Sequence, residues 1–591
     1  MAPPEPRVVR EGTFRFLAAY AVALTAAQTL SIAVSLAHVV MGQAVSLLIL
    51  ASSLAAAWRY AVWLKPAGPV ARVRSSARLE LGIAAGVMAV AGGVYVLSWI
   101  AAIAKPDLSW DGNSYHIPMM HLWARRGFIH WIQFDYDPGP EWNWLFHWLF
   151  NGYPKGAETI DFLLVRAAGS SLPANVNNLV YLPVGVAGVA VAGRALGASR
   201  LASWTAGAAL GLVPTVVGQG MTSYVDASLG ESMAALVGCL VVVLPIVRRG
   251  ELPWKTIPAL ASTVGLTASA KSSGLAPALL AGGLLVLASA WAVVRSAPGT
   301  RRVLARRHLA FTGAVAAIAF AVTGYWYVRS WYYTGNPLSP VRVALLGHQI
   351  FPGVPLKDSI SEDVLTPDFM AGWPGWKRVA FTWLQGGVHL GDLSHQSWLE
   401  WASTEHHWPR SMRWYDAHDG GLGYLWVLAC LPAIAFAGLA AWRNREHDEA
   451  EAGPRLDVFV PMAFVVGVSF LVVPMNWWAR YTVGLFALGL PCLAWVIDRV
   501  ARAPWPGVRA LLGVWLAGCF AIASFESLYQ FRYSGLEGGF LAAPWKVTYT
   551  PAGLWHDLIW YEDPTYLYAL SPLDVEVNST NEPVALGSFE I

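Results

Sequence analysis

Charged residues are scarce in this chain. Only 13% of its 591 residues are Asp, Glu, Lys or Arg, whereas 56% are hydrophobic. A soluble domain carries about a quarter of its residues as charges, because its surface has to be hydrated. The scarcity excludes a water-soluble globular protein. Repeated apolar stretches of roughly 20 residues predict instead an all-α polytopic membrane protein.

Cysteine is also rare, and nothing in the chain points to a disulfide framework. The four cysteines lie in apolar stretches, which favours buried small side chains over disulfides or metal ligands. They are Cys239, Cys430, Cys492 and Cys519. The opening sequence MAPPEPRVVREGTFRF is a short basic arm without a small-residue cleavage site, so no cleavable signal peptide is expected. The net charge of +3 is spread over short loops, which argues against nucleic acid as a partner.

Apolar windows predict about thirteen transmembrane helices by the length rule. The expected spans are 14–37, 39–64, 80–104, 174–194, 201–219, 228–247, 256–270, 273–294, 308–328, 421–441, 457–474, 478–498 and 507–526. The neighbours 256–270 and 273–294 can also be read as one kinked element.

Lys and Arg fall mainly in the connections on one side of this arrangement. These are Lys65, Arg72, Arg74 and Arg78, then Arg194 and Arg200, then Arg248, Arg249 and Lys255, then Arg301, Arg302, Arg306 and Arg307, then Arg443, Arg445 and Arg455, then Arg499, Arg502 and Arg509. The positive-inside rule places them, with the N-terminus, in the cytoplasm. The long connections 105–173 and 329–420 then face the extracytoplasmic side. The abundance of Ala, Gly and Arg fits a multi-pass protein of a bacterial inner or plasma membrane.

The first long outer connection begins with LSWDGNSYHIPMMHLWARRGFIHWIQ, residues 108–133. Asp111-Gly112 predicts a turn. Apolar residues at Ile117, Met120 and Trp123 then predict an amphipathic helix lying in the membrane interface. Two interpretations of Asp111 stay open, a helix cap and a reaction centre.

The histidines of this region read as polar residues of the interface. Zinc is not favoured, because the i, i+4 spacing of a helical metal site is missing. The histidines in question are His116, His121, His130 and His147.

Further ionisable residues gather at the outer ends of the expected spans. They are Asp226 and Glu231 in TSYVDASLGES, Lys271 in ASAKSSGLAP, Arg329 in GYWYVRS, and Arg480 beside Tyr481 in MNWWARYTVG. An ionisable residue in a membrane indicates a functional site, because its burial requires a partner. For each cation alone, snorkelling to lipid headgroups is the alternative.

A sugar linked to a lipid phosphate is a substrate that suits this set of residues. Arg and Lys would hold the phosphate and stabilise the negative charge that grows on it. An aspartate on the other side of the anomeric carbon would accept the proton of the acceptor hydroxyl. The many Trp residues at the loop ends would stack on the sugar and line the entry for the lipid.

These residues resemble motifs of the GT-C superfamily of polyprenyl-phosphate-sugar-dependent glycosyltransferases, in the branch of protein O-mannosyltransferases and aminoarabinose transferases. The pattern W-D-x-x-x-Y-H-x-P, followed by H-W-I-Q, is carried by Trp110, Asp111, Tyr115, His116 and Pro118, then His130, Trp131, Ile132 and Gln133. GNPLSP (Gly335 to Pro340) after Arg329 is similar to the segment R-N-x-x-x-x-G-N-P-L-Y-P, with Ser330 and Ser339 replacing Asn and Tyr. Looser matches are YPKGAE ending at Glu158, YVD at Asp226, Lys271 in AKSSG and ARY at Arg480.

The resemblance covers residues 80–500 and implies an inverting glycosyltransferase with Asp111 as general base. It implies a polyprenyl-phosphate sugar as donor and a hydroxyl of a protein, lipid or glycan as acceptor. The substrate-binding residues implied are Tyr115, His116, His130, Glu158, Asp226, Lys271, Arg329, Asn336, Arg480 and Tyr481. Some relatives use a divalent cation such as Mg²⁺ or Mn²⁺, for which Asp111, Glu158 and Asp226 are candidate ligands.

Five regions follow from the spans and the resemblance. They are an N-terminal transmembrane hairpin (1–79), a GT-C-like catalytic module (80–328) with its first outer loop (105–173), an extracytoplasmic loop region (329–420), C-terminal transmembrane helices (421–526) and an extracytoplasmic tail (527–591). Family members usually reach the first outer loop after one span, so the hairpin 1–79 is a departure from the family.

Two other classes of function compete with the transferase. A transporter or flippase of lipid-linked sugars would spread its charges through the membrane depth and show a broken helix and internal repeats. No repeat is visible, and the charges gather on one face. A non-catalytic scaffold would bind a partner through the Trp-rich segment 371–425, which could equally cover an active site and shape an acceptor groove.

Overall fold

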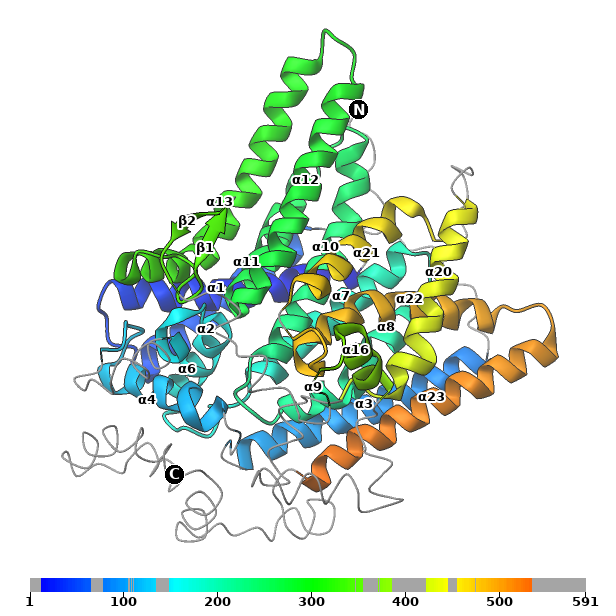
Figure 1. Cartoon of the computed structure of the whole chain (residues 1–591), viewed down its shortest axis with the longest axis horizontal. Coiled ribbons are helices and arrows are strands. Elements are labelled where there is room, and N and C mark those ends of the chain that lie inside the picture. Colours follow the sequence, from blue (N-terminus) through cyan, green and yellow to red (C-terminus); the bar gives the residue numbers. More distant parts are fainter. Residues whose placement is uncertain are drawn as a thin grey trace.

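The computed structural model describes residues 12–64, 78–104, 107, 109, 111–133, 148–345, 347–353, 370, 372–384, 421–444, 454–473 and 475–533. This part of the chain is almost entirely helical (Figure 1). Ten of its helices are long and apolar enough to cross a membrane. The predicted class, an all-α polytopic membrane protein, is therefore confirmed.

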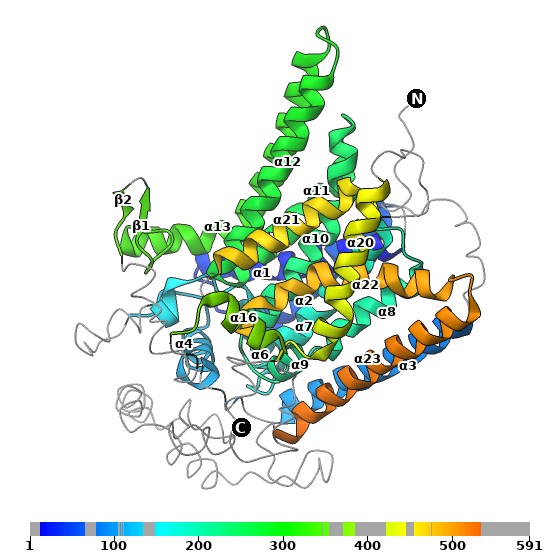
Figure 2. The same cartoon turned by 45° about the vertical axis from the view of Figure 1, so that its right-hand side comes forward.

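The long helices make up the body of the molecule. They are α1 (Gly12–Leu36), α2 (Gln43–Trp63), α3 (Arg78–Ala104), α7 (Asn177–Ala195), α10 (Asp226–Arg248), α12 (Leu275–Arg295), α13 (Arg301–Thr334), η8 (Trp426–Cys430) continued by α20 (Leu431–Arg443), α21 (Leu456–Val472), η10 (Ala479–Leu485) continued by α22 (Phe486–Ala501), and α23 (Pro506–Tyr533). Figure 1 and Figure 2 show α3 and α23 side by side along one flank.

Shorter elements connect and cover these helices. They are η2 (Gly112–His116), α4 (Ile117–Arg126), η3 (Trp148–Gly152), α6 (Gly156–Ala168), α8 (Arg200–Ala208), η4 (Ala209–Leu212), α9 (Pro214–Gln219), η5 (Trp254–Thr256), α11 (Ile257–Ala270), η6 (Ser272–Gly274), α16 (Gly375–Leu384) and the antiparallel strands β1 (Val343–Leu345) and β2 (His348–Phe351).

The expected count of thirteen spans is not confirmed. The expected span 201–219 is divided into α8, η4 and α9, because the residue that begins α9, Pro214, cannot donate a backbone hydrogen bond. Helix α11 has 14 residues, a length of about 21 Å against a hydrocarbon core of about 30 Å. Lys271 between α11 and α12 is extended (φ −160°, ψ 159°), so these helices are not one kinked element.

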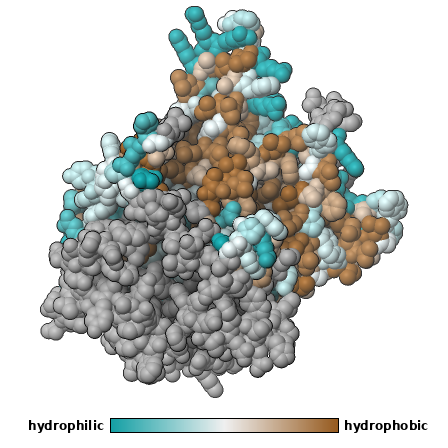
Figure 3. Space-filling model, in the orientation of Figure 1, coloured by the Kyte–Doolittle hydropathy of each residue, from teal (hydrophilic) through white to brown (hydrophobic). Residues whose placement is uncertain are grey.

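Two of the connections expected on one side of the membrane lie across the bundle from α4 and α6, which belong to the first outer connection. In Figure 1 these are the α12–α13 turn at the top and the α22–α23 turn at the right, with α4 and α6 at the lower left. Figure 3 shows hydrophilic side chains at the tip of the α12–α13 hairpin and apolar ones below it. This agrees with the alternation of the predicted spans. Which side faces the cytoplasm stays a prediction.

Helix α10 is the centre of the bundle, and it packs closely against α7. A Cβ atom added to Gly188 of α7 would lie 2.4 Å from the carbonyl oxygen of Ala234 in α10. A Cβ atom on Gly238 would in turn lie 2.6 Å from the oxygen of Gly188. Small residues at matching positions thus let the two backbones touch, which is how membrane helices gain packing energy where lipid supplies no hydrophobic drive.

A proline in α7 ties two outer helices to this centre. Pro183 lacks an N–H group, so the carbonyl of Leu179 loses its helical donor. The Tyr95 hydroxyl of α3 donates to that carbonyl at 3.0 Å, and the Tyr20 hydroxyl of α1 donates to the next one, Val180, at 2.8 Å. In an apolar surrounding the bond from Tyr95 spares the Leu179 oxygen the cost of burial without a donor.

The close contact at Gly188 predicts that a Gly→Ala substitution destabilises the protein there but not at a glycine with open space around it. Gly188→Ala would push a methyl group into the α10 backbone, so we expect a loss of about 1–3 kcal/mol and a lower thermal midpoint in detergent. The control is Gly282→Ala in α12, where an added Cβ meets nothing within 4 Å. It should be neutral, or stabilising by up to ~1 kcal/mol. Equal midpoints for the two variants would contradict close α7–α10 packing.

Candidate active site

Charged residues from four distant parts of the chain meet at one end of the bundle, called the site end below. Asp111 directly precedes η2, Asp226 is the first residue of α10, Lys271 follows the last residue of α11, and Arg480 lies in η10. The positions of Asp226 and Lys271 follow helix electrostatics. An acid is favoured at a helix N-terminus, as with Asp226, and a cation at a helix C-terminus, as with Lys271.

The four side chains form an alternating row of charges. Arg480 Nη1 donates to Asp111 Oδ2 at 3.0 Å, and its Nε lies 4.0 Å from Asp226 Oδ2. The Nζ of Lys271 donates to Asp226 Oδ1 at 2.6 Å. All four are buried or nearly so, and two positive charges balance two negative ones. Each ion therefore keeps a partner, which a buried charge requires. We call this row the charge ladder.

Aromatic rings enclose the cationic members of the ladder. Lys271 Nζ lies 4.3 Å from the centre of the Tyr481 ring, and the Arg480 guanidinium carbon lies 4.9 Å, 5.0 Å and 5.1 Å from the rings of Tyr224, Trp478 and Tyr481. Burial favours the neutral amine of Lys271, but the Asp226 carboxylate outweighs it and raises the lysine pKa. Lys271 is therefore a full positive charge at neutral pH.

The start of the first outer loop is built differently from its prediction. The expected turn at Asp111-Gly112 is wrong, because Asp111 has helical angles (φ −62°, ψ −38°). Its carboxylate makes no capping hydrogen bond, so the cap interpretation does not account for it either. The Asp107 carboxylate occupies the space beside Gly112, where an added Cβ atom would lie 2.0 Å from Asp107 Oδ2.

Asp107 fastens this loop to the start of α10. Its Oδ2 accepts hydrogen bonds from both the backbone N–H and the hydroxyl of Ser223, each at 2.6 Å, and its Oδ1 accepts one from the N–H of Ser109 at 2.8 Å. Burial still raises the pKa of Asp107, against these hydrogen bonds. The loop thereby delivers Asp111 to a position beside Asp226.

A second buried group continues from the ladder along η2. His116 Nδ1 lies 3.0 Å from Glu158 Oε1, and Lys155 Nζ lies 3.4 Å from the same oxygen and 3.2 Å from the centre of the Tyr153 ring. The Tyr115 ring, one turn after Asp111, is 4.2 Å from the His116 ring. This group therefore adjoins the ladder through a single helical turn.

The pKa values of Lys155 and Glu158 in the second buried group are both lowered, with different effects on their charges. Burial lowers the pKa of Lys155 to about 7, although Glu158 opposes the change. Burial would raise the pKa of Glu158, but Lys155 and the hydrogen bond with His116 outweigh it and hold that pKa below its usual value. Glu158 is thus ionised, and Lys155 exchanges its proton near neutral pH.

Arg329 lies in a separate aromatic pocket. Its Nη2 donates to the carbonyl of Asn151 at 2.8 Å, and its guanidinium carbon is 4.7 Å from the ring of Trp326 and 5.5 Å from that of Trp131. Its Nε and Nη1 are buried without a hydrogen-bond partner among the described residues. Arg329 and Lys271 both depress the pKa of Lys155, so Lys155 lies within electrostatic reach of both cations.

Two of the implied substrate-binding residues make their hydrogen bonds with the backbone. Asn336 Nδ2 donates to the carbonyls of Val341 at 2.8 Å and Pro352 at 2.7 Å, and its Oδ1 accepts from the N–H of Leu338 at 2.8 Å. The Asn336 side chain therefore holds the segment after α13 in place, and these hydrogen bonds are all made with backbone groups. His130 Nδ1 lies 3.0 Å from the Phe128 carbonyl, and burial lowers its pKa.

The remaining histidines do not add a charge to the site. Burial lowers the pKa of His121 to about 4, so it is neutral at physiological pH. His147 lies outside the described residues, as does Trp110 of the first motif.

Sequence reasoning missed several residues of the site. Lys155 had a signal, because its spacing of three from Glu158 places both on one helical face. Tyr224 and Trp478 had no such signal in the sequence, because they contact Arg480 only in the folded structure.

The candidate metal ligands Asp111, Glu158 and Asp226 do not fit a divalent cation in this arrangement. The Arg480 guanidinium lies where a cation bridging Asp111 and Asp226 would sit, and Glu158 is engaged by His116 and Lys155. Within the described chain, no three His, Cys, Asp or Glu side chains are placed to share a metal ion.

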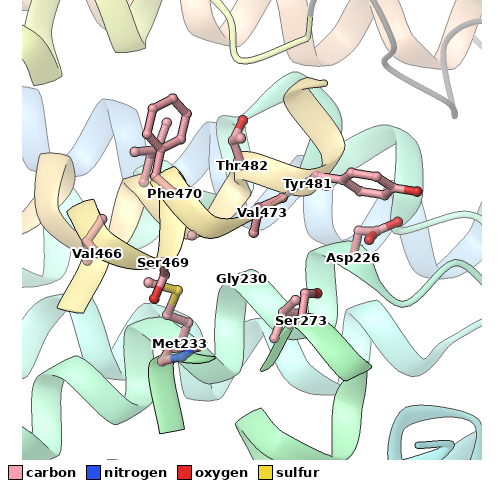
Figure 4. A pocket seen from close by; sticks show the side chains of 14 residues that line it. Asp226, Gly230, Met233, Ser273, Val466, Ser469, Phe470, Val473, Tyr481 and Thr482 are labelled. Carbon is pink, nitrogen blue, oxygen red and sulfur yellow. The ribbon is translucent and has the colours of Figure 1, made fainter. Parts of the chain in front are cut away.

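A pocket opens beside the ladder between α10, α12 and α21 (Figure 4). Asp226, Tyr481 and Ser273 lie at one end of the pocket, and mostly apolar side chains including Met233, Val466 and Phe470 line its continuation. The pocket therefore has a polar end at Asp226, the ladder residue in its lining, and a mainly apolar body among membrane helices.

Comparison of the chain with protein-family models, curated proteins and solved structures found no match. The resemblance to GT-C transferases thus stays a prediction that rests on the motifs quoted above.

The ladder predicts energetic coupling between residues 369 positions apart. Asp111→Asn and Arg480→Gln should each lower the thermal midpoint, because each leaves a buried charge without its partner. The double variant should be less destabilised than the sum, with a coupling energy of about 1–3 kcal/mol. Asp111→Asn combined with Arg502→Gln, whose arginine pairs with Asp498 instead, is the control and should be additive. Additivity in both pairs would contradict the ladder.

Proposed function

We propose that this protein is an integral membrane glycosyltransferase that moves a sugar from a polyprenyl-phosphate donor to an acceptor hydroxyl. The observation that carries the proposal is the charge ladder, whose Asp226 lines the polar end of a pocket with a mainly apolar body. A lipid-linked sugar phosphate has the same three parts in the same order. Its anion needs cations, its lipid needs an apolar channel open to the membrane, and its sugar needs a base beside the anomeric carbon.

The donor phosphate would bind between Lys271 and Arg480. Both cations are desolvated and surrounded by rings, so their hydrogen bonds to a phosphate are stronger than in water. The prenyl chain would follow the apolar wall formed by Met233, Val466 and Phe470. A lipid in this position enters sideways from the bilayer, without crossing the polar end of the site.

Phosphate binding would also release the base. In the ladder, Arg480 holds Asp111 and Lys271 holds Asp226. An incoming phosphate competes with both carboxylates for the two cations. Asp111 then becomes free to accept a hydrogen bond from the acceptor hydroxyl, so the base is available when a donor is present.

The transfer itself balances with these residues alone. The acceptor oxygen attacks the anomeric carbon from the face opposite the phosphate, and the bond between that carbon and the phosphate oxygen breaks. The proton of the acceptor passes to Asp111, and the bond electrons leave with the lipid phosphate. Lys271 and Arg480 stabilise the anion that departs. Attack opposite the leaving group inverts the anomeric centre.

The second buried group would position the sugar. Tyr115, His116, Lys155 and Glu158 lie one helical turn from Asp111 and offer both donors and acceptors to hydroxyl groups. Arg329 lies within electrostatic reach of Lys155, and its Nε and Nη1 have no hydrogen-bond partner among the described residues. This set supports sugar recognition, whereas the ladder supports phosphate binding.

A flippase or transporter of lipid-linked sugars is the second candidate. It is favoured by the early end of α11 at Lys271 and by the division of the 201–219 segment, since transporters bind substrates at broken helices. A non-catalytic scaffold stays the third, and most of its proposed surface, 371–425, lies outside the described residues. Neither alternative requires a base at Asp111.

Loss of the base is the direct test. Asp111→Asn should reduce sugar transfer from a polyprenyl-phosphate donor by about 10²–10⁴-fold in membranes. The control is Asp457→Asn, an exposed partner of Arg455 at the far end of the bundle, and it should retain wild-type transfer. Wild-type transfer in Asp111→Asn would remove Asp111 as the base. Absence of transfer by the wild-type protein with any common donor, together with lipid translocation, would favour the flippase.

Lys271 should act mainly on donor binding. Lys271→Met removes a charge-assisted hydrogen bond, so KM for the donor should rise about tenfold to hundredfold while kcat changes less. Lys255→Met, before the other end of α11, is the matched control because both substitutions remove a lysine that flanks the same helix. An unchanged KM in Lys271→Met would show that the phosphate binds elsewhere.

A further inference from the structure

Arginines gather at the end of the bundle opposite the candidate site. Helix α10 begins at Asp226 and ends in two arginines, and α12 begins near Lys271 and ends in another, so these residues lie a helix length away from the ladder. Helix α13 begins with four more within its first two turns. The arginines are Arg248, Arg249, Arg295, Arg301, Arg302, Arg306 and Arg307, and all are exposed. We call them the arginine end.

The exposed side chains of α13 show where a bilayer would meet this end. Near the site end, Trp331, Tyr332 and Tyr333 are 59%, 81% and 49% exposed, as in the aromatic belt of a membrane interface. The helical distance from Trp331 to Arg307 is about 36 Å, slightly more than a hydrocarbon core of about 30 Å. Leu309, directly beside the arginines, is 73% exposed. The arginines therefore lie at the level of the lipid headgroups.

An exposed tryptophan joins two of these arginines. The guanidinium carbon of Arg295 lies 4.6 Å from the centre of the Trp291 ring, and that of Arg248 lies 5.4 Å from it. Contact with a ring face leaves the N–H edges of a guanidinium available, and these edges match the oxygens of a phosphate. The contact also fixes the end of α10 to the end of α12.

The arginines of α13 lack the negative charges that would balance them. The first turn of α13 contains no acidic residue. Among the described residues, no carboxylate forms an ion pair with Arg302, Arg306 or Arg307. The positive end of the helix dipole adds to their mutual repulsion. Elsewhere at this end of the bundle, Arg455 pairs with Asp457 at 2.7 Å and Arg502 with Asp498 at 2.7 Å.

We infer that the arginine end is a binding surface for the phosphate groups of anionic phospholipids. A phospholipid brings its phosphate and its acyl chains together, which matches arginines placed within one turn of exposed apolar residues such as Val303 and Leu309. A soluble acidic protein would match the arginines and leave these apolar side chains uncovered. The inference stands independently of the proposed transferase activity.

The surface also has a structural consequence for the site. Helices α12 and α13 run from the arginine end to Lys271 and Arg329, respectively. Headgroups bound at one end would hold both helices at a fixed depth in the bilayer. Anionic lipid would thereby help to keep Lys271 and Arg329 at a constant depth in the bilayer.

Lipid titration of the full-length protein in detergent tests the surface. Dioctanoyl phosphatidylglycerol should raise the thermal midpoint with an apparent affinity at least tenfold higher than dioctanoyl phosphatidylcholine. The variant Arg302→Gln, Arg306→Gln, Arg307→Gln should lose at least tenfold of the affinity for phosphatidylglycerol and none for phosphatidylcholine. The control Arg455→Gln, Arg502→Gln, with arginines already paired, should behave as wild type.

Two further arms decide the outcome. Inorganic phosphate that reproduces the full effect would overturn the lipid assignment in favour of a free-phosphate site. If the triple variant fails to fold, wild type in 0.5 M NaCl replaces it, and unchanged affinity there would overturn the inference.

Discussion

The arrangement of the site depends on the position of Arg480 between two carboxylates. Asp111, Asp226 and Arg480 come from a loop, a helix start and a 3₁₀ segment that are far apart in the chain. None of the three could be buried alone, because an unpaired ion in an apolar surrounding loses its hydration without compensation. Their mutual pairing therefore fixes the first outer loop, α10 and η10 in one geometry.

Close helix packing supplies the frame for this pairing. Gly188 and Gly238 allow α7 and α10 to touch, so the α10 N-terminus is held rigidly at the site end. Asp107 then joins the outer loop to Ser223, which lies just upstream of that N-terminus. Helix α10 ends at the exposed Arg248 of the arginine end. One frame thus carries cations at both ends, beside aromatic rings at the site and exposed at the arginine end.

The membrane class and the main charged residues were predictable from the chain itself. The length of an apolar stretch and the presence of an ionisable residue within it are local properties of the sequence. Lys271, Asp226 and Arg480 stood out as ionisable residues in apolar sequence, and the structure places them together. The turn at Asp111 was predicted wrongly, because Asp111 has helical angles and η2 follows it directly. Gly112 instead allows the close approach of Asp107. Asn336 matched a motif, but its hydrogen bonds all serve backbone. Motif matching cannot separate such a role from substrate contact.

By itself, the chain determined that most of its length lies in a membrane, where its spans approximately fall, and which charges require partners. Hydropathy, helix length and the cost of burial act on short segments, so these properties need no knowledge of the fold. Only the tertiary structure decided which charge meets which, that a pocket with an apolar body adjoins the ladder, and that Lys155 joins Glu158 and His116. These properties arise from contacts between helices remote in sequence, and the balance of burial against pairing is settled only when those helices pack.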